Sequence, residues 1–132
     1  MTTYNVHETS KAARSFTTDL GQRLIESHRR FNPNDDPSSI KVLTYFLHSS
    51  SGNGLIVGSG GDMMSYRHIR VIIDIVAGRK TADEKQDMMR RAMECCTEYE
   101  GKKAQDCEFE IRINEVEEAH VMRMLPGRKQ MV

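Results

Sequence analysis

The sequence predicts an α/β protein of the α+β type, in which two β-α-β units build one four-stranded sheet with two helices on one face. Two observations predict this fold. Segments typical of strand, helix and strand follow one another in the first part of the chain, and the same order returns after a glycine-rich connection at 51–63. The length of 132 residues suits one core. We therefore expect a single domain over residues 1–132, with units at about 1–50 and 64–116.

Alternation of apolar residues predicts the strands. Isoleucine and valine recur at every second position from Ile69 to Ile75, and Phe109, Ile111 and Ile113 repeat the pattern later. A period of two places such side chains on one face of a strand. We expect strands over 3–8, 40–48, 66–76 and 107–116, and the two strands of each unit should run parallel.

Each predicted helix has a stripe of apolar residues three or four positions apart, which is typical of a helix with one buried face. The stripe of the helix at 10–31 consists of Phe16, Leu20, Leu24 and Phe31, and that of the helix at 81–100 consists of Met89, Ala92, Met93 and Cys96. Thr81 and Glu84 form a capping-box pattern, which predicts the start of the second helix. With no third helix, the other face of the sheet stays uncovered, and this predicts an oligomer.

Charge and hydropathy argue against several classes of function. Lys plus Arg and Asp plus Glu each total 19, so the formal net charge is zero, which argues against nucleic-acid or membrane binding by bulk charge. No apolar run is long enough to span a bilayer, and the first residues lack the pattern of a signal peptide. Cys95, Cys96 and Cys107 have no metal-binding spacing. We expect a cytoplasmic protein with free thiols and no metal.

Two residues stand where ligands are often bound. His28 continues the apolar stripe of the first helix and is either a core histidine with satisfied nitrogens or a pocket residue that holds an anion or moves a proton. Arg79 follows Gly78 in the turn after a strand, where α/β sheets gather ligands, and its guanidinium suits a carboxylate. The alternative for Arg79 is a solvated surface residue.

A third cluster lies at the end of the last strand. Glu115, Glu117, Glu118 and His120 crowd this region. Such a run is usually a solvated face. As an alternative, one of its carboxylates turns inward as a general base.

Five short strings occur in a fixed order along nearly the whole chain. They are "TYNVHE", "RLIESHRRF", "IVGSGG", "GRKTADEK" and "VMRMLPG". Together they resemble the tautomerase superfamily, and in particular its branch with cis-3-chloroacrylic acid dehalogenase. They match the first strand, a helix with a histidine three residues after an isoleucine, a strand ending in a Gly-Gly turn, the G-R loop before the second helix, and the closing Leu-Pro segment.

The resemblance implies a homotrimer of β-α-β-β-α-β protomers that acts on small carboxylates. Activities in this superfamily include keto–enol tautomerisation, hydrolytic dehalogenation of small unsaturated acids and decarboxylation of a small keto-type acid. None of these activities uses a metal or an organic cofactor. We therefore expect a small carboxylate as ligand and no cofactor.

The resemblance also implies roles for single residues. His28 matches the histidine that helps to hold the substrate carboxylate, and Arg79 matches one of two carboxylate-binding arginines. Val76 stands where the second arginine is expected. The water-activating glutamate of the family aligns with His120, or with Glu118 after a shift of two residues.

Two further family positions are altered in this chain. The tyrosine of the last strand falls near Phe109 or Arg112. The signature proline, whose secondary amine acts as base or acid, is replaced by Thr2. Threonine offers a primary amine and a hydroxyl, which can serve as base, Schiff-base former or nucleophile once Met1 is cleaved. If Met1 is retained, the amine is displaced by one residue.

These departures leave more than one function open. The first is an atypical enzyme with weak or altered proton transfer on a 2-oxo or unsaturated carboxylate, in which Thr2, His28 or Glu118 takes part and efficient dehalogenation is not expected. The second is a non-catalytic pseudoenzyme that binds a ligand in the same pocket. The third is an interaction module on the trimer scaffold.

Overall fold

The computed structural model describes residues 1–9, 20–47, 67–124 and 126. Its strands and longer helices are β1 (Thr2–Thr9), α1 (Leu20–Phe31), β2 (Ile40–Leu47), β3 (Arg67–Val76), α2 (Ala82–Glu100) and β4 (Cys107–Val116). Each predicted strand agrees with the observed one to within one residue at either end. The glycine-rich connection at 51–63 and the predicted helical residues 10–19 lie outside the described residues.

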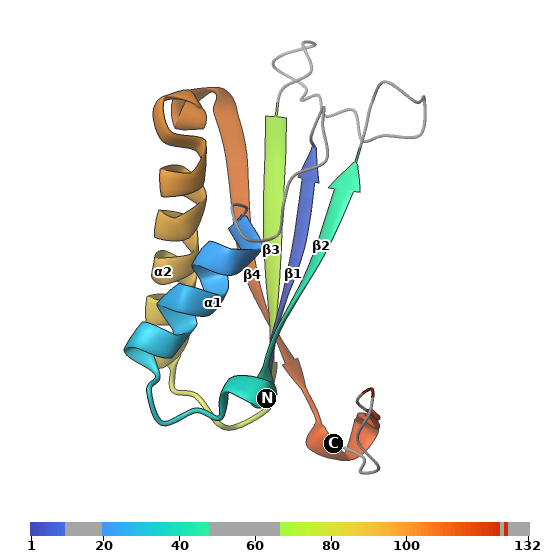
Figure 1. Ribbon diagram of the computed structural model, residues 1–132. Coiled ribbons are helices and arrows are strands. Elements are labelled where there is room, and N and C mark those ends of the chain that lie inside the picture. The colour runs from blue at the N-terminus through green and yellow to red at the C-terminus, as the bar shows by residue number, and fades with distance from the viewer. Residues whose placement is uncertain (10–19, 48–66, 125, 127–132) are drawn as a thin grey trace.

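The four strands form one mixed sheet in the order β2-β1-β3-β4 (Figure 1). Within each unit the two strands are parallel, because β1 pairs with β2 and β3 pairs with β4. The units join through the antiparallel pair of β1 and β3, in which Thr2 lies opposite Ile75 and Thr3 opposite Asp74. The predicted four-stranded fold with two helices is confirmed.

Alternation along the strands separates two faces of the sheet. Residues of even number in β1 and of odd number in β3 turn toward the helices, and the β3 set from Ile69 to Ile75 is buried as predicted. The buried apolar core consists of Tyr4, Val6, Leu20, Leu24, Ile69, Val71, Ile73, Ile75, Met88, Ala92, Cys95 and Cys96. In the described part of the chain, both longer helices pack on this one face.

Two details of the predicted helix stripes are wrong. The buried stripe of α2 contains Met88, Ala92, Cys95 and Cys96, so it begins one residue before Met89. Met89 and Met93 are only half-buried, because they lie at the margin of the helix face that meets the sheet. Phe31 is 45% exposed, and its ring packs under the guanidinium of Arg91 at 4.1 Å instead of entering the core.

The start of α2 is fixed by the predicted capping box. The Thr81 hydroxyl accepts a hydrogen bond from the backbone N–H of Glu84 (3.1 Å), and the Glu84 carboxylate accepts one from the N–H of Thr81 (2.9 Å). These bonds lower the pKa of Glu84. The helix therefore begins at Ala82, directly after the turn that carries Arg79.

Replacing Thr81 by Ala is expected to reduce the free energy of unfolding by about 1 kcal/mol, because one end of the capping box is lost. Urea denaturation measures this change. Thr97→Ala, in the last turns of the same helix, is the matched control and should change stability by less than about 0.5 kcal/mol. Equal effects of the two substitutions would contradict the importance of the cap.

Candidate functional site

A cavity of about 400 Å³ lies at the end of the sheet where β1 begins and where β3 and β4 end. Figure 1 shows the amino end of the chain and the segment after β4 at this same end. Four charged residues line the cavity, together with two hydroxyl-bearing residues and the first residue of the chain. They are Asp74, Arg79, Glu118, Arg123, Thr3, Ser39 and Met1.

The turn between β3 and α2 places Arg79 in this cavity. Gly78 has φ +78°, a left-handed conformation that favours glycine. The Arg79 N–H donates to the carbonyl of Val76 (3.4 Å). The Lys85 ammonium donates to Glu115 (3.1 Å), and this bond, with one from the N–H of Gly78, lowers the pKa of Glu115. Glu115 therefore holds the turn and does not face the cavity.

Arg79 already binds a carboxylate of its own chain. Its Nη2 atom lies 3.0 Å from Oε2 of Glu118, in the short 3₁₀ helix η5 (Glu118–His120) that follows β4. The two side chains are 66% and 72% exposed, so the pair is worth about 1 kcal/mol at most. The carboxylate of a ligand can therefore replace Glu118 on Arg79 at little cost.

The second guanidinium of the cavity belongs to Arg123. Arg123 was not among the predicted site residues, although it lies in the string "VMRMLPG", two residues before Leu125. Among the residues that the structure describes, no carboxylate forms an ion pair with Arg123. The cavity thus gains a second positive charge from the segment after β4, although Val76 occupies the position at which the second arginine was expected.

Asp74 is also part of the cavity, and it lies within the alternating stretch from Ile69 to Ile75. It lies on β3 with its side chain on the face away from the helices, between neighbours on β1 and β4. The amide of Asn5 donates to its Oδ2 atom (2.9 Å), and the amide of Asn114 donates to its Oδ1 atom (3.0 Å). Two neutral donors thus fix the orientation of the carboxylate.

The amine was expected either on Met1 or, after cleavage of Met1, on Thr2. Thr2 is the first residue of β1, is paired with Ile40 on β2 and Ile75 on β3, and is only 7% exposed with its side chain on the helix side. Met1 lines the cavity. The start of the chain therefore reaches the same site as Arg79 and Glu118.

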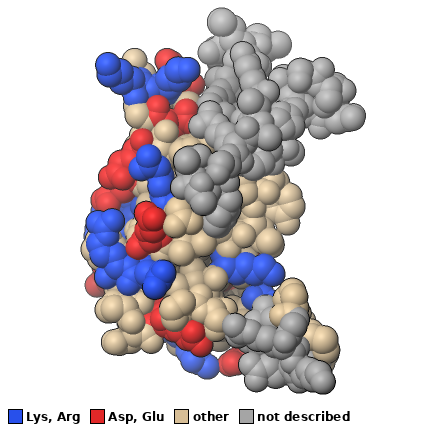
Figure 2. All heavy atoms as spheres, viewed as in Figure 1, with Lys and Arg blue, Asp and Glu red and all other residues tan. Residues whose placement is uncertain are grey.

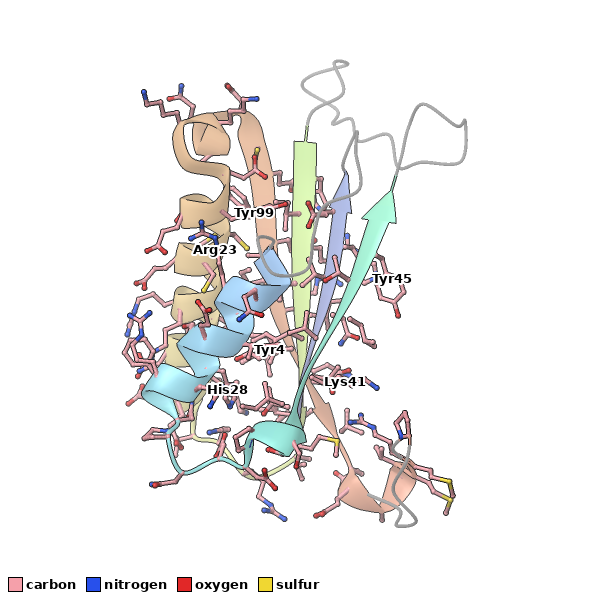
Figure 3. All side chains as sticks on the ribbon, in the orientation of Figure 1. Tyr4, Arg23, His28, Lys41, Tyr45 and Tyr99 are labelled. Carbon is pink, nitrogen blue, oxygen red and sulfur yellow. The ribbon has the colours of Figure 1, made fainter. Side chains whose placement is uncertain are left out.

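His28 lies on the other face of the sheet. The residue is only 3% exposed. Its Nδ1 atom lies 2.8 Å from the Tyr4 hydroxyl, and its Nε2 atom lies 2.8 Å from Oδ2 of Asp35. In the neutral tautomer with its proton on Nε2, His28 donates to Asp35 and accepts at Nδ1 from the Tyr4 hydroxyl. Burial raises the pKa of Tyr4 well above its usual value. Figure 3 shows this pair between α1 and the sheet.

The structure does not bring His28 into the cavity with Arg79. A void of about 10 Å³ beside Tyr4 and His28 holds no more than one water molecule. Both ring nitrogens have protein partners, as in the core alternative considered for this residue. The hydrogen bond between His28 on α1 and Tyr4 on β1 therefore links the helix to the sheet.

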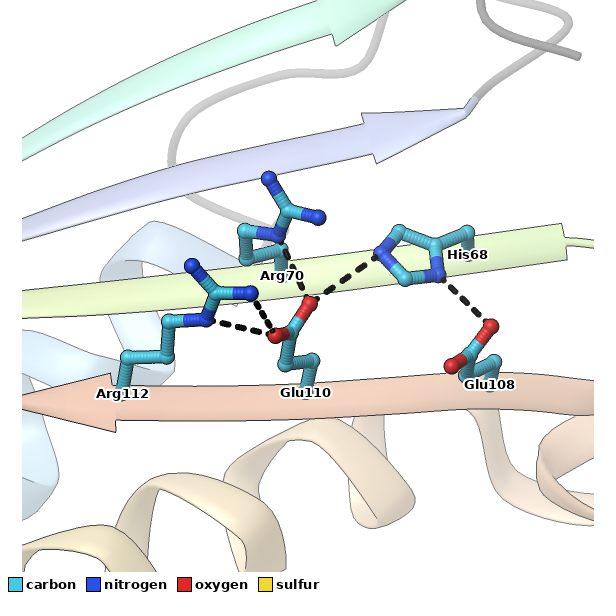
Figure 4. Close-up of polar contacts among 5 residues, drawn as sticks. All are labelled: His68, Arg70, Glu108, Glu110 and Arg112. Atoms are coloured by element: carbon cyan, nitrogen blue, oxygen red, sulfur yellow. Dashed lines mark hydrogen bonds and ion pairs between the residues drawn. The ribbon is translucent and has the colours of Figure 1, made fainter. Parts of the chain in front are cut away.

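Arg112 and His120 also lie outside the cavity lining. Arg112 donates to Glu110 on the open face of the sheet, and Arg70 donates to the other oxygen of the same carboxylate (2.8 Å) (Figure 4). The hydrogen bond from Arg70 is the main reason why the pKa of Glu110 is lowered. Beside them, Nδ1 of His68 lies 3.1 Å from Oε1 of Glu108, within hydrogen-bond distance. His120 is exposed at the end of η5.

On the face shown in Figure 2, basic and acidic side chains are interspersed.

The three cysteines are free, as predicted, and burial raises the pKa of Cys96 to about 12 and raises that of Cys95. Within the described ranges, no group of His, Cys, Asp and Glu is placed to hold a metal ion. None of the helices described is long and apolar enough to cross a membrane.

Comparisons with known proteins support the fold. No family model and no curated protein matches the chain. The structure of Pt0534 inactivated by 2-oxo-3-pentynoate matches with a TM-score of 0.68 at 15% identity, over 95% of this chain and 93% of that one. A symmetric trimer of wild-type fused 4-OT matches with a TM-score of 0.63 at 14% identity, over 90% and 89% of the two chains.

A third solved structure also matches the fold. The macrophage migration inhibitory factor of Toxoplasma gondii has a TM-score of 0.59 at 10% identity and covers 96% of this chain and 97% of that one. These neighbours are tautomerase-superfamily proteins. The chain therefore has the fold of that superfamily, as the local strings predicted. The branch with cis-3-chloroacrylic acid dehalogenase stays a prediction.

Tyr4→Phe is expected to lower the free energy of unfolding by about 1–3 kcal/mol, because it leaves the buried Nδ1 of His28 without a donor. Chemical denaturation monitored by circular dichroism measures the loss. Tyr45→Phe is the control, because Tyr45 is 47% exposed on the open face and keeps its ring stacked on His7. If both variants unfold like the native chain, the Tyr4–His28 bond does not stabilise the fold.

Proposed function

We propose that the protein binds a small 2-oxo or unsaturated carboxylate in the cavity at the end of β1, β3 and β4, and moves a proton on it slowly, as a weak tautomerase. The observation that carries the proposal is the position of the Arg79 guanidinium. Its guanidinium lines the cavity beside Met1 and is engaged only by an exposed carboxylate within the described part of the chain. The match to Pt0534, which was inactivated by the 2-oxo acid 2-oxo-3-pentynoate, supports this ligand class.

Arg79 binds the ligand carboxylate in this proposal, and Glu118 is the counter-ion that the ligand displaces. Charge-assisted hydrogen bonds from a guanidinium to a carboxylate are roughly twice as strong as neutral ones. The amine of Met1, or that of Thr2 after cleavage of Met1, and the released Glu118 are the proton-transfer groups that the family resemblance implies. His28 fixes β1, from the helix side of the sheet.

A non-catalytic protein with the same pocket is the second candidate. It is favoured by Thr2 in place of proline and by Val76 in place of the second arginine. This candidate binds the same carboxylates without turnover. Binding and turnover measured on the same samples therefore separate the two functions.

Arg79→Ala is expected to raise the KM for enol–keto conversion of phenylpyruvate by about 10-fold to 100-fold, because the variant loses a charge-assisted hydrogen bond worth about 1.5–3 kcal/mol. Ultraviolet absorbance of the enol measures the rate. Arg90→Ala is the matched control, since Arg90 pairs with Asp87 on the exposed face of α2. Native turnover that is insensitive to Arg79→Ala would refute the proposed site.

The amine is examined in the same assay. Intact mass first establishes whether Met1 is present on the purified protein. In Thr2→Pro, cleavage of Met1 exposes a secondary amine at the position that the family uses. A gain of activity in this variant would support a pocket built for amine chemistry, and binding without turnover in both proteins would favour the non-catalytic candidate.

We also propose a homotrimer in a reducing cytoplasm. Within the described residues, the sheet face with Tyr45, Arg70 and Arg112 has no helix over it, and the fused 4-OT neighbours are symmetric or asymmetric trimers. Sedimentation equilibrium should give three times the protomer mass of 15.1 kDa. A mass equal to one protomer at micromolar concentration would overturn the assembly but not the ligand proposal.

A further inference from the structure

We propose that Asp74 is the residue that accepts the substrate proton in this cavity, in place of the amino-terminal amine. The inference rests on the proposed function, because it concerns the same ligand and the same site. Asp74 lines the cavity together with Arg79 and Met1. A 2-oxo acid whose carboxylate lies on Arg79 therefore has its remaining carbons inside a cavity that also contains the Asp74 carboxylate.

Two hydrogen bonds fix the orientation of Asp74. Asn5 on β1 and Asn114 on β4 hold its two oxygens from both sides, at 2.9 and 3.0 Å. Among the described residues no cation forms an ion pair with Asp74. Each oxygen keeps a lone pair, because a carboxylate accepts more than one hydrogen bond at each oxygen. The carboxylate is thus oriented by neutral donors and keeps lone pairs that can take a proton.

Glu118 is less suited to this role. Its carboxylate is paired with the guanidinium that binds the ligand, and its side chain is 72% exposed to water. It also lies in a short 3₁₀ helix after the last strand, whereas Asp74 lies within a strand that is paired on both sides. A base carried by a paired strand is positioned more accurately than one on a terminal segment.

The amine is less suited for a different reason. Its position changes by one residue with the presence or absence of Met1, but the position of Asp74 does not. The register of β1 and β3 sets Asp74 opposite Thr3 in either form of the chain. Proton transfer through Asp74 is therefore independent of processing at the amino end.

The step balances without a co-reactant. The C3–H bond of the 2-oxo acid breaks, and its proton goes to an oxygen of Asp74. The electron pair of that bond forms the C2=C3 double bond, and the carbonyl electron pair moves to the C2 oxygen, which takes a proton from water to give the enol. The hydroxide that is left takes the proton from Asp74, so that water and the Asp74 carboxylate are regenerated. The reverse sequence returns the keto acid. The positive charges of Arg79 and Arg123 stabilise the negative charge that develops on the C2 oxygen.

The test is exchange of the C3 protons of 2-oxobutanoate for deuterium in D₂O, followed by proton NMR with the full chain. Asp74→Asn is expected to lower the exchange rate by at least about 100-fold, the usual effect of removing a general base. The affinity for 2-oxobutanoate, from an NMR titration, should change by less than about threefold. Asp106→Asn is the matched control and should exchange like the native chain, because Asp106 lies just before β4, at the end of that strand away from the cavity.

A second variant guards against loss of the fold. Because Asp74→Asn sets a third amide against those of Asn5 and Asn114, Asp74→Ala is measured beside it, with thermal unfolding recorded for both. Loss of exchange in a folded Asp74→Ala chain that still binds 2-oxobutanoate supports the inference. Exchange that persists in this variant overturns it.

Three further outcomes are distinguishable. If a Gly-Ser extension before Met1 abolishes exchange while Asp74→Asn keeps it, the amine is the base and the inference is wrong. If the native chain binds 2-oxobutanoate without any exchange above the buffer rate, the inference is wrong and the binding part of the proposed function stands. Failure of the native chain to bind 2-oxobutanoate, phenylpyruvate or an unsaturated acid overturns the proposed function as well.

Discussion

The hydrogen bonding of β1 on both sides is the constraint on which the rest of the molecule depends. β1 lies between its own unit's second strand and the first strand of the other unit, parallel to one and antiparallel to the other. Without this strand the two β-α-β units would share no sheet. The antiparallel pairing also brings the start of the chain to the end of β3, so Thr3 and Asp74 become neighbours across the sheet. The cavity is a consequence of this register.

The two faces of the sheet have different chemistry. The helix side holds the apolar core, and within it Tyr4, His28 and Asp35 are joined by hydrogen bonds. The open side carries charged and amide groups, including Asp74 and the Arg70–Glu110–Arg112 cluster. The apolar core and the residues proposed to act on a ligand therefore lie on opposite faces, so a substitution on one face can leave the other largely intact.

Local patterns predicted most of the fold and only part of the site. Alternation and the capping box give strand positions and the start of α2 directly, because both are set by residues close in sequence. Arg79 and Glu118 were placed at ends of strands and do meet in the cavity. Asp74 and Arg123 were missed, because their importance comes from cross-strand register and from the path of the chain after β4, which no local period encodes. The partner of His28, Asp35, lies in a loop and was hidden for the same reason.

The early start of β1 also limits access to the first peptide bond. A peptidase cleaves a segment that has opened, but in the folded protein Thr2 is paired with strands on both sides and is nearly buried. Cleavage between Met1 and Thr2 in the folded protein therefore requires the start of β1 to separate from the sheet. The pairing that joins the two units thus also protects the first peptide bond.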